Sequence, residues 1–305
     1  MALRRFLWAR SSSLGRTVWT CWRRTCKGGS DRHSSCKRSR VQNSLAEVML
    51  RRLSFFSITC GLLAVLTASF AQADKGNRSI SSLNSAQRLL ERVHKNHPQT
   101  FLCGCTYKGG FPNHASCGYL PKKQDTAAYM VVWAPVVPFR VFGAQLSAWQ
   151  KGHPKCKNRR GQPFRGRRCA EKMSKRYRLL QADLYNLQPM IAELVGLRTT
   201  TGPLPFEKRD FGSCDVEVQN GVLEPGADVR GDVARTFFYM DRVYPDFVFI
   251  SAELRRSLDS WHLEDPVDVW ECQRSRRIQE IQGNLNPVLD EACHFAITQG
   301  FLSLR

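Results

Sequence analysis

Three arginines have the side-chain chemistry to bind a phosphate group: Arg198, Arg230 and Arg235. The planar guanidinium fork of arginine matches two phosphate oxygens at once. Each of them also lies beside a predicted helix, where an arginine can cap the helix end or form an ion pair. Both roles stay open for Arg198, whereas the structural role is favoured for Arg230 and Arg235.

A second candidate group is the pair His94 and His97, which are three residues apart on a predicted helix and could chelate a metal ion. No third ligand lies near them in the sequence, so we interpret both as surface groups. The tripeptide Arg230-Gly231-Asp232 matches a cell-adhesion signal. Here it indicates a turn into a helix, with Asp232 near the positive helix end.

The elements that must position these groups follow from hydrophobic spacing and from breakers. A helix is predicted from about Ser85 and ends at Pro98. Strands with a bend are predicted over Ala127 to Phe142, because this run is β-branched and aromatic and contains three prolines. Residues 101–125 are rich in Gly, Cys and turn formers, which indicates short irregular strands stapled by disulfides.

The second half of the chain is predicted to be mainly helical. Pro189 suits the first turn of a helix, and Gly283 ends the last one. Four tryptophans are assigned to the core rather than to base stacking: Trp133, Trp149, Trp261 and Trp270. The predicted helices are Tyr177 to Leu187, Met190 to Leu197, Asp232 to Arg242, Ser251 to Trp261 and Asp268 to Gln282.

The N-terminal quarter resembles targeting sequence. After Met49, two arginines precede an apolar run from Leu53 to Leu66 and then Ala71-Gln72-Ala73. This order of basic, apolar and small residues is that of a secretory signal peptide. The apolar run is too short to favour a permanent membrane span. We therefore assign 49–73 to a signal peptide and expect no stable span after its cleavage.

Residues 1–48 precede this signal and contain only two acidic residues, Asp31 and Glu47. Either translation starts at Met49, or these residues form an added targeting or disordered tail. We prefer the first interpretation, because a signal peptide belongs at the N-terminus. The remainder, 74–305, has no internal repeat and no long linker, so one mixed α+β domain is expected.

The cysteines indicate an oxidising compartment. An even number of them follows the predicted signal peptide, which allows up to four disulfides. A zinc site is disfavoured because Cys103 and Cys105 are too close in sequence for the usual knuckle spacing. Cys156 with Cys169 and Cys272 with Cys293 are plausible local pairs, and the sequence leaves the remaining pairing open. The full set is Cys103, Cys105, Cys117, Cys156, Cys169, Cys214, Cys272 and Cys293.

The whole chain carries a formal net charge of +20. Residues 74–305 alone have 33 basic and 24 acidic residues, a formal charge of +9. This excess favours anionic partners such as nucleic acid or a phospholipid surface. Eight basic residues fall between 150 and 169, which we interpret as a solvated basic loop: Lys151, Lys155, Lys157, Arg159, Arg160, Arg165, Arg167 and Arg168.

Six segments together resemble the bacterial endonuclease I family of secreted or periplasmic nucleases. They occur in the family's order and run through nearly all of 74–305. They are Thr100 to Cys105, Ser116 to Tyr119, Gln181 to Leu187, Arg230 to Arg235, Pro266 to Cys272 and Ile281 to Asn284.

The resemblance implies a mixed α/β fold with a ββα-metal (His-Me finger) motif, in which two strands and a helix hold one divalent ion, usually magnesium. It also implies cleavage of DNA, and often RNA, at phosphodiester bonds with little sequence preference. Such hydrolysis needs a base to activate water and a hard cation to neutralise the scissile phosphate.

In the family, the motif around the first ligand is Trp-Glu-His-Val-Val-Pro, where Glu binds the metal and His is the general base. Aligned on this sequence, Ala134 replaces the Glu and Pro135 replaces the His. The second family ligand, an asparagine, is present as Asn186. An arginine that follows a Gly-Gly pair in some members is missing, because the matching stretch is Gly152 to Cys156.

These replacements predict impaired hydrolysis. Ala134 offers no oxygen, and the neutral amide of Asn186 alone should hold magnesium poorly. Pro135 cannot accept a proton, and a general base alone contributes about 10²- to 10⁴-fold. A substitute pair, His153 as base with Asp183 as ligand, is disfavoured because Asp183 already has a family counterpart beside an intact site.

The sequence thus predicts a monomeric, exported protein, secreted or periplasmic, with a nuclease fold and impaired activity. Two alternatives stay open: a relative that binds nucleic acid without cutting it, and an exported fold reused for an unrelated partner. The candidates for nucleic-acid contact are Lys155, Arg198, Arg230 and Arg235.

Overall fold

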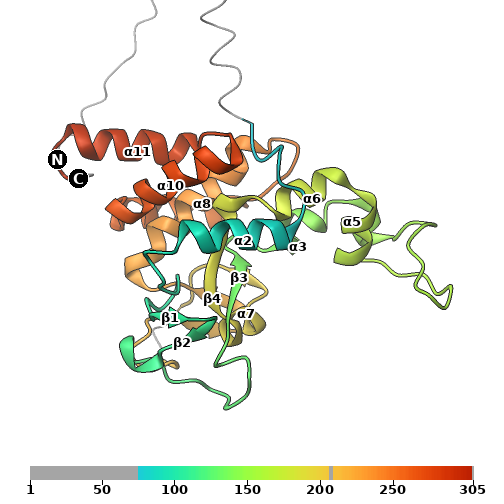
Figure 1. Ribbon diagram of the computed structural model, residues 1–305, viewed down its shortest axis with the longest axis horizontal. Coiled ribbons are helices and arrows are strands. Elements are labelled where there is room, and N and C mark those ends of the chain that lie inside the picture. Colours follow the sequence, from blue (N-terminus) through green and yellow to red (C-terminus); the bar gives the residue numbers. More distant parts are fainter. Residues whose placement is uncertain (1–74, 206–208, 304–305) are drawn as a thin grey trace, which may run out of the picture. The chain divides into compact units, whose positions relative to one another are not determined.

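The computed structural model describes residues 75–205 and 209–303 (Figure 1). All the described residues belong to one compact unit. The predicted extension 1–48 and signal peptide 49–73 lie outside the described residues. Within the described part, no helix is long and apolar enough to cross a membrane.

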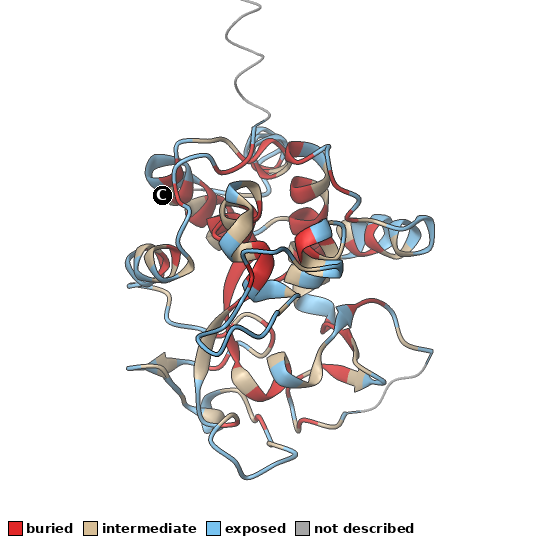
Figure 2. Ribbon diagram, turned by 90° about the vertical axis from the view of Figure 1, so that its right-hand side faces the viewer, coloured by how far each residue is buried: buried red, intermediate tan, exposed pale blue. Residues whose placement is uncertain are grey.

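A pair of antiparallel strands lies at the centre of the fold. β3 (Val131–Pro135) pairs with β4 (Leu187–Ile191), and α7 (Ala192–Leu197) follows β4 directly. All five residues of β4 are buried, so the strand runs through the protein interior (Figure 2). This succession of two strands and a helix has the form of the ββα motif that the family resemblance implies.

Two smaller sheets lie elsewhere in the described part. β1 (Tyr107–Lys108) pairs antiparallel with β2 (Phe111–Pro112). The other sheet has the order β5-β7-β6, in which the short strand β5 (Thr200–Thr201) is parallel to β7 (Val222–Glu224) and β6 (Glu217–Gln219) is antiparallel to it. The expected short, irregular strands within 101–125 are therefore present.

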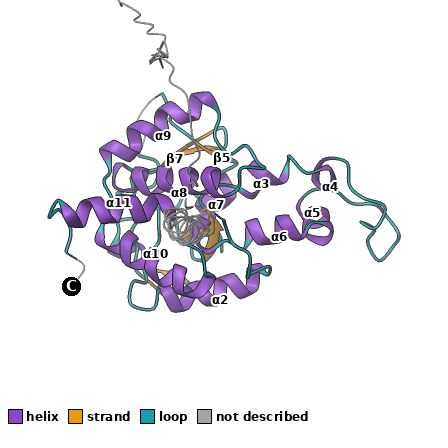
Figure 3. Cartoon of the chain, turned by 90° about the horizontal axis from the view of Figure 1, so that it is seen from above, coloured by secondary structure: helices purple, strands orange, loops and turns teal. Residues whose placement is uncertain are grey.

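Five longer helices make up most of the secondary structure (Figure 3). They are α2 (Leu83–Val93), α8 (Arg230–Val243), α9 (Ala252–Glu264), α10 (Val269–Gln282) and α11 (Pro287–Thr298). Besides α7, the shorter helices are α3 (Phe139–Gly143), α4 (Ser147–Gln150), α5 (Arg167–Met173) and α6 (Lys175–Gln181), with 3₁₀ turns η1 (His114–Ser116), η2 (Leu184–Asn186) and η3 (Ala227–Val229).

Local sequence explains the ends of these helices. Ser82 caps α2 by accepting a hydrogen bond from the Ser85 N–H. Asp268 and Glu271 form a capping box at the start of α10, and Gly283 ends it with φ 83°. The predicted helices at these positions are confirmed within a few residues, as are α8 and α9.

Three element predictions are wrong. Pro189 does not start a helix but lies inside β4, and the helix begins at Ala192. Proline is tolerated there because both strands of a two-stranded sheet are edge strands. The helix predicted over Tyr177 to Leu187 ends at Gln181, and the extended run after Ala127 gives way to α3 once Pro138 is passed.

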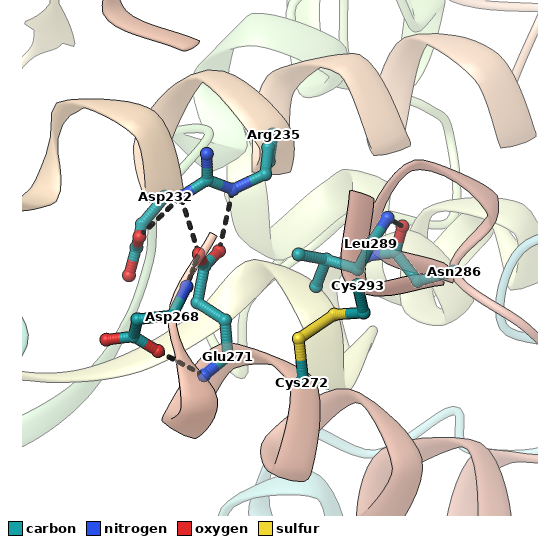
Figure 4. Close-up of a disulfide and its surroundings, with 8 residues drawn as sticks. All are labelled: Asp232, Arg235, Asp268, Glu271, Cys272, Asn286, Leu289 and Cys293. Carbon is teal, nitrogen blue, oxygen red and sulfur yellow. Dashed lines mark hydrogen bonds and ion pairs between the residues drawn. A yellow bond between two sulfur atoms is a disulfide. The ribbon is translucent and has the colours of Figure 1, made fainter. Parts of the chain in front are cut away.

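Four disulfides use all eight cysteines that follow residue 73. Both plausible local pairs, Cys156–Cys169 and Cys272–Cys293, are confirmed, and the second joins α10 to α11 (Figure 4). The pairs that the sequence left open are Cys105–Cys117 and Cys103–Cys214. The last of these joins segments 111 residues apart.

Candidate active site

The three family site positions meet at one end of the central strand pair. Ala134 lies opposite Gln188 in the β3–β4 register, and Pro135 lies opposite Leu187. The backbone pairing extends one residue beyond the strands, because the N–H of Val136 donates to the carbonyl oxygen of Asn186 at 2.8 Å. The structure therefore brings the adjacent residues Ala134 and Pro135 next to Asn186, which is far from them in the sequence.

Asn186 uses both ends of its side-chain amide to tie these segments together. Its Oδ1 accepts from the backbone N–H of Val137 at 2.7 Å, and its Nδ2 donates to the Val137 carbonyl at 3.1 Å. The residue is completely buried. Through these two hydrogen bonds, Asn186 links the start of β4 to the residues that follow β3.

Arg198 places a positive charge at the same end of β3. Its guanidinium donates to the carbonyl oxygens of Pro135 and, at 3.3 Å, of Val136. Burial lowers the pKa of Arg198 to about 10, so the group is still cationic at neutral pH. Arg198 therefore has the structural role of holding the end of β3 through these hydrogen bonds. Its positive charge also lies directly beside Ala134 and Pro135.

Asp183 belongs to a buried hydrogen-bond network. Its Oδ2 accepts from the hydroxyls of Tyr239 at 2.9 Å and Tyr244 at 2.6 Å, and its Oδ1 accepts from Gln282 Nε2 at 3.0 Å. Burial raises the pKa of Asp183, and these hydrogen bonds oppose the rise. His153, its proposed partner in the substitute pair, is exposed on the basic loop. The Asp183 carboxylate is surrounded by these three hydrogen-bond donors. The structure therefore does not support Asp183 and His153 as a substitute metal ligand and base.

Comparison with known proteins identifies the family. The family model described as Endonuclease I matches residues 60–293. The chain belongs to the endonuclease I family. It is 34% identical over 240 residues to an extracellular deoxyribonuclease of Aeromonas hydrophila, covering 76% of this chain and 96% of that protein.

Two further relatives extend the comparison. A periplasmic deoxyribonuclease of Aeromonas hydrophila is 32% identical over 240 residues, which cover 76% of this chain and 93% of the relative. An Endonuclease-1 of Buchnera aphidicola is 34% identical over 225 residues, which cover 71% of this chain and 84% of the relative. The similarity thus spans most of each relative's length.

Endonuclease I membership implies a divalent metal, but the site of this chain does not fit one. Ala134 and Pro135 have no side-chain oxygen or nitrogen ligand to offer. The Asn186 amide is engaged with the Val137 backbone. Across the described part of the chain, no group of three His, Cys, Asp or Glu side chains is arranged to hold a metal ion.

The other arginine candidates for phosphate contact are engaged in ion pairs within the protein. Arg235 is 1% exposed and binds Glu271, with Nε and Oε1 2.9 Å apart, as well as Asp232 (Figure 4). Arg230 binds Glu224 at 2.8 Å and lies over the ring of Trp261. These ion pairs agree with the structural role that the sequence favoured for Arg230 and Arg235. Because Arg235 is buried, it cannot reach a phosphate without leaving the interior.

Lys155, the remaining candidate, is exposed on the basic loop. Its carbonyl oxygen accepts a hydrogen bond from Lys172 Nζ at 2.5 Å, while its own side chain makes no contact with an acidic group of the described residues. Lys155 is therefore the one of these candidates whose charge faces solvent.

The interpretation of His94 as a surface group is wrong. The side chain is 2% exposed and packs edge-on against Trp133 and Trp270. Its Nε2 accepts from Arg274 Nε at 3.2 Å. Burial, reinforced by Arg274, lowers the pKa of His94 to about 2, so the ring is neutral. His97 is half-buried and stacks on Trp270.

Arg274 is a supporting residue that the sequence analysis missed. It is 4% exposed and donates to the carbonyl oxygens of Leu184 at 2.8 Å and Leu187 at 2.7 Å, so it joins α10 to the start of β4 beside Asn186. Its only sequence signal is an arginine on the predicted α10 helix, which by itself indicates a solvated face. Arg274, His94 and Gln188 line a cavity of about 210 Å³ with several carboxylates.

Proposed function

We propose that this protein is an exported nucleic-acid-binding member of the endonuclease I family whose own phosphodiester hydrolysis is impaired. The observation that carries the proposal is the end of β3, where buried Ala134 and Pro135 stand beside an Asn186 whose amide is engaged. The names of the relatives, deoxyribonucleases from outside the cell or the periplasm, support DNA as the partner and export as the destination.

Hydrolysis of a phosphodiester requires a water that loses its proton as it attacks. Pro135 has no basic atom at the position of the family's histidine, and a general base contributes about 10²- to 10⁴-fold. Arg198 supplies positive charge next to this position, but a guanidinium cannot accept a proton at neutral pH. The site therefore has a positive charge but no group that can activate water.

Export is part of the proposal. Residues 49–73 act as the signal peptide, and 74–305 form the mature domain. The four disulfides support this assignment, because such bonds persist in oxidising compartments. No stable membrane span is expected after cleavage, and a monomer is the expected form.

The test is a pair of measurements on the purified chain. Duplex DNA should bind in EDTA with an affinity that falls steeply as salt rises. The same DNA should stay intact when EDTA is replaced by magnesium. Efficient cleavage would show an active nuclease and overturn the impairment, and absence of any binding would favour a fold reused for another partner.

A further inference from the structure

The basic hairpin, defined here as residues 156–169, extends outward from α4 and α5 (Figures 1 and 3). Its two sides meet at the antiparallel bridge between Lys157 and Pro163, and the Cys156–Cys169 disulfide closes its base. It contains no acidic residue and six exposed basic ones: Lys157, Arg159, Arg160, Arg165, Arg167 and Arg168.

Hydrogen bonds define the shape of the tip. Asn158 Oδ1 accepts from the N–H groups of Arg160 at 2.9 Å and Gln162 at 3.0 Å, and the Asn158 N–H donates to the Gln162 carbonyl at 2.9 Å. Gly161 supplies the positive φ of 76° that the reversal requires. Arg159 and Arg160 are therefore consecutive exposed residues on a hydrogen-bonded turn.

Folding does not account for this charge. No carboxylate in the described part of the chain forms an ion pair with any of the six basic residues. Two of them contact aromatic rings instead: Arg167 lies over Phe139 and Arg168 over Phe164. Concentrated like charge destabilises a compact protein, so an anionic partner is the natural complement.

We propose that the basic hairpin binds the phosphates of duplex nucleic acid without regard to sequence, with Arg159 and Arg160 as its leading contacts. The inference rests on the proposed function and names the surface that performs the binding. A two-stranded ribbon fits the major groove of DNA, and arginine forks match phosphate oxygens.

The composition of the hairpin favours a duplex over other polyanions. Recognition of single strands relies on aromatic side chains that stack on bases, but Phe164, the hairpin's one aromatic residue, is only half-exposed beneath Arg168. Binding to a lipid surface through an inserted apolar face needs exposed large hydrophobic residues. None of those on the described surface lies in 156–169.

The experiment compares two charge-matched double variants of the full chain on a duplex DNA oligonucleotide in EDTA. Arg159→Ser/Arg160→Ser, the tip variant, removes two exposed arginines from the tip of the basic hairpin. Arg256→Ser/Arg276→Ser, the α9/α10 variant, removes two exposed arginines from α9 and α10. Each lost phosphate contact should lower the slope of log affinity against log salt by about 1. The tip variant should therefore bind more weakly with a slope smaller by about 2, while the α9/α10 variant keeps the original slope.

Three results would overturn the inference: an unchanged tip variant, equal losses in both variants, or tip-dependent binding to anionic phospholipid vesicles that exceeds binding to the duplex. A failure of the unmodified chain to bind DNA would instead contradict the proposed function. Circular dichroism of each variant checks that its fold is intact before binding is compared.

Discussion

At the residue scale, the end of β3 has regular backbone pairing but no side chain that can activate water. Ala134 and Pro135 lie in register with Gln188 and Leu187, and Asn186 is hydrogen-bonded to the Val137 backbone. The sequence alone could name these positions, because the neighbouring motif residues align them. It could not show that the Asn186 amide is engaged, since that depends on a contact between segments 49 residues apart.

Arg235 offers a residue-scale prediction that separates a structural role from phosphate binding. Arg235→Ala leaves the buried Glu271 without its partner, and breaking a buried ion pair costs about 3 to 5 kcal/mol. We expect this loss in the free energy of unfolding, measured in urea. Binding of DNA by the folded variant should be unchanged, and a variant with normal stability but weaker binding would contradict the assignment.

At the element scale, α2 and α10 pack around a histidine that the sequence placed on the surface. The sequence correctly predicted the helix that forms α2, but it gave no sign that Trp133 and Trp270 would close over His94 from β3 and α10. A polar residue near a helix end is exposed by default, and only the tertiary packing overrides that default.

This burial predicts a pH dependence of stability. The pKa of His94 is lowered from 6.5 to about 2 in the folded protein. Below pH 6.5 the unfolded chain therefore binds a proton at His94 that the folded protein does not bind. Stability from this group is complete above pH 6.5 and falls by up to about 1.4 kcal/mol per pH unit below it.

Unfolding in urea at several pH values from 7 to 5 measures the effect. His94→Gln keeps a hydrogen-bond acceptor for Arg274 but cannot titrate, so its stability should fall less steeply with acid. His153→Gln, a substitution of an exposed histidine, should behave like the unmodified protein. Identical slopes for His94→Gln and the unmodified protein would contradict the assigned environment.

At the scale of the whole molecule, the Cys103–Cys214 disulfide links parts that are distant in sequence. The two local pairs could be predicted from proximity along the chain, but Cys103–Cys214 could not, because it depends on the fold bringing residue 103 to residue 214. The same limit explains Pro189: its helical assignment was locally sound, and pairing of β4 with β3 overrode it. The mixed α/β fold itself was predictable, since motifs along the chain carried the family resemblance.

Loop length predicts which disulfide matters most for stability. A bond that closes a longer loop restricts the unfolded chain more, so typical losses of about 2 to 5 kcal/mol should be larger for Cys103→Ser/Cys214→Ser than for Cys156→Ser/Cys169→Ser. Thermal unfolding of the two double variants measures the order. A larger loss from the 13-residue separation would contradict it.

The most direct test of the account is digestion of plasmid DNA with magnesium by the unmodified chain and by Ala134→Glu/Pro135→His. Near-UV circular dichroism verifies that both are folded. The account predicts no cleavage by the unmodified chain under conditions in which the double variant cuts, with rates at least about 10²-fold apart. Cleavage by the unmodified chain at a rate equal to that of the variant would contradict the claim that this site has lost its chemistry.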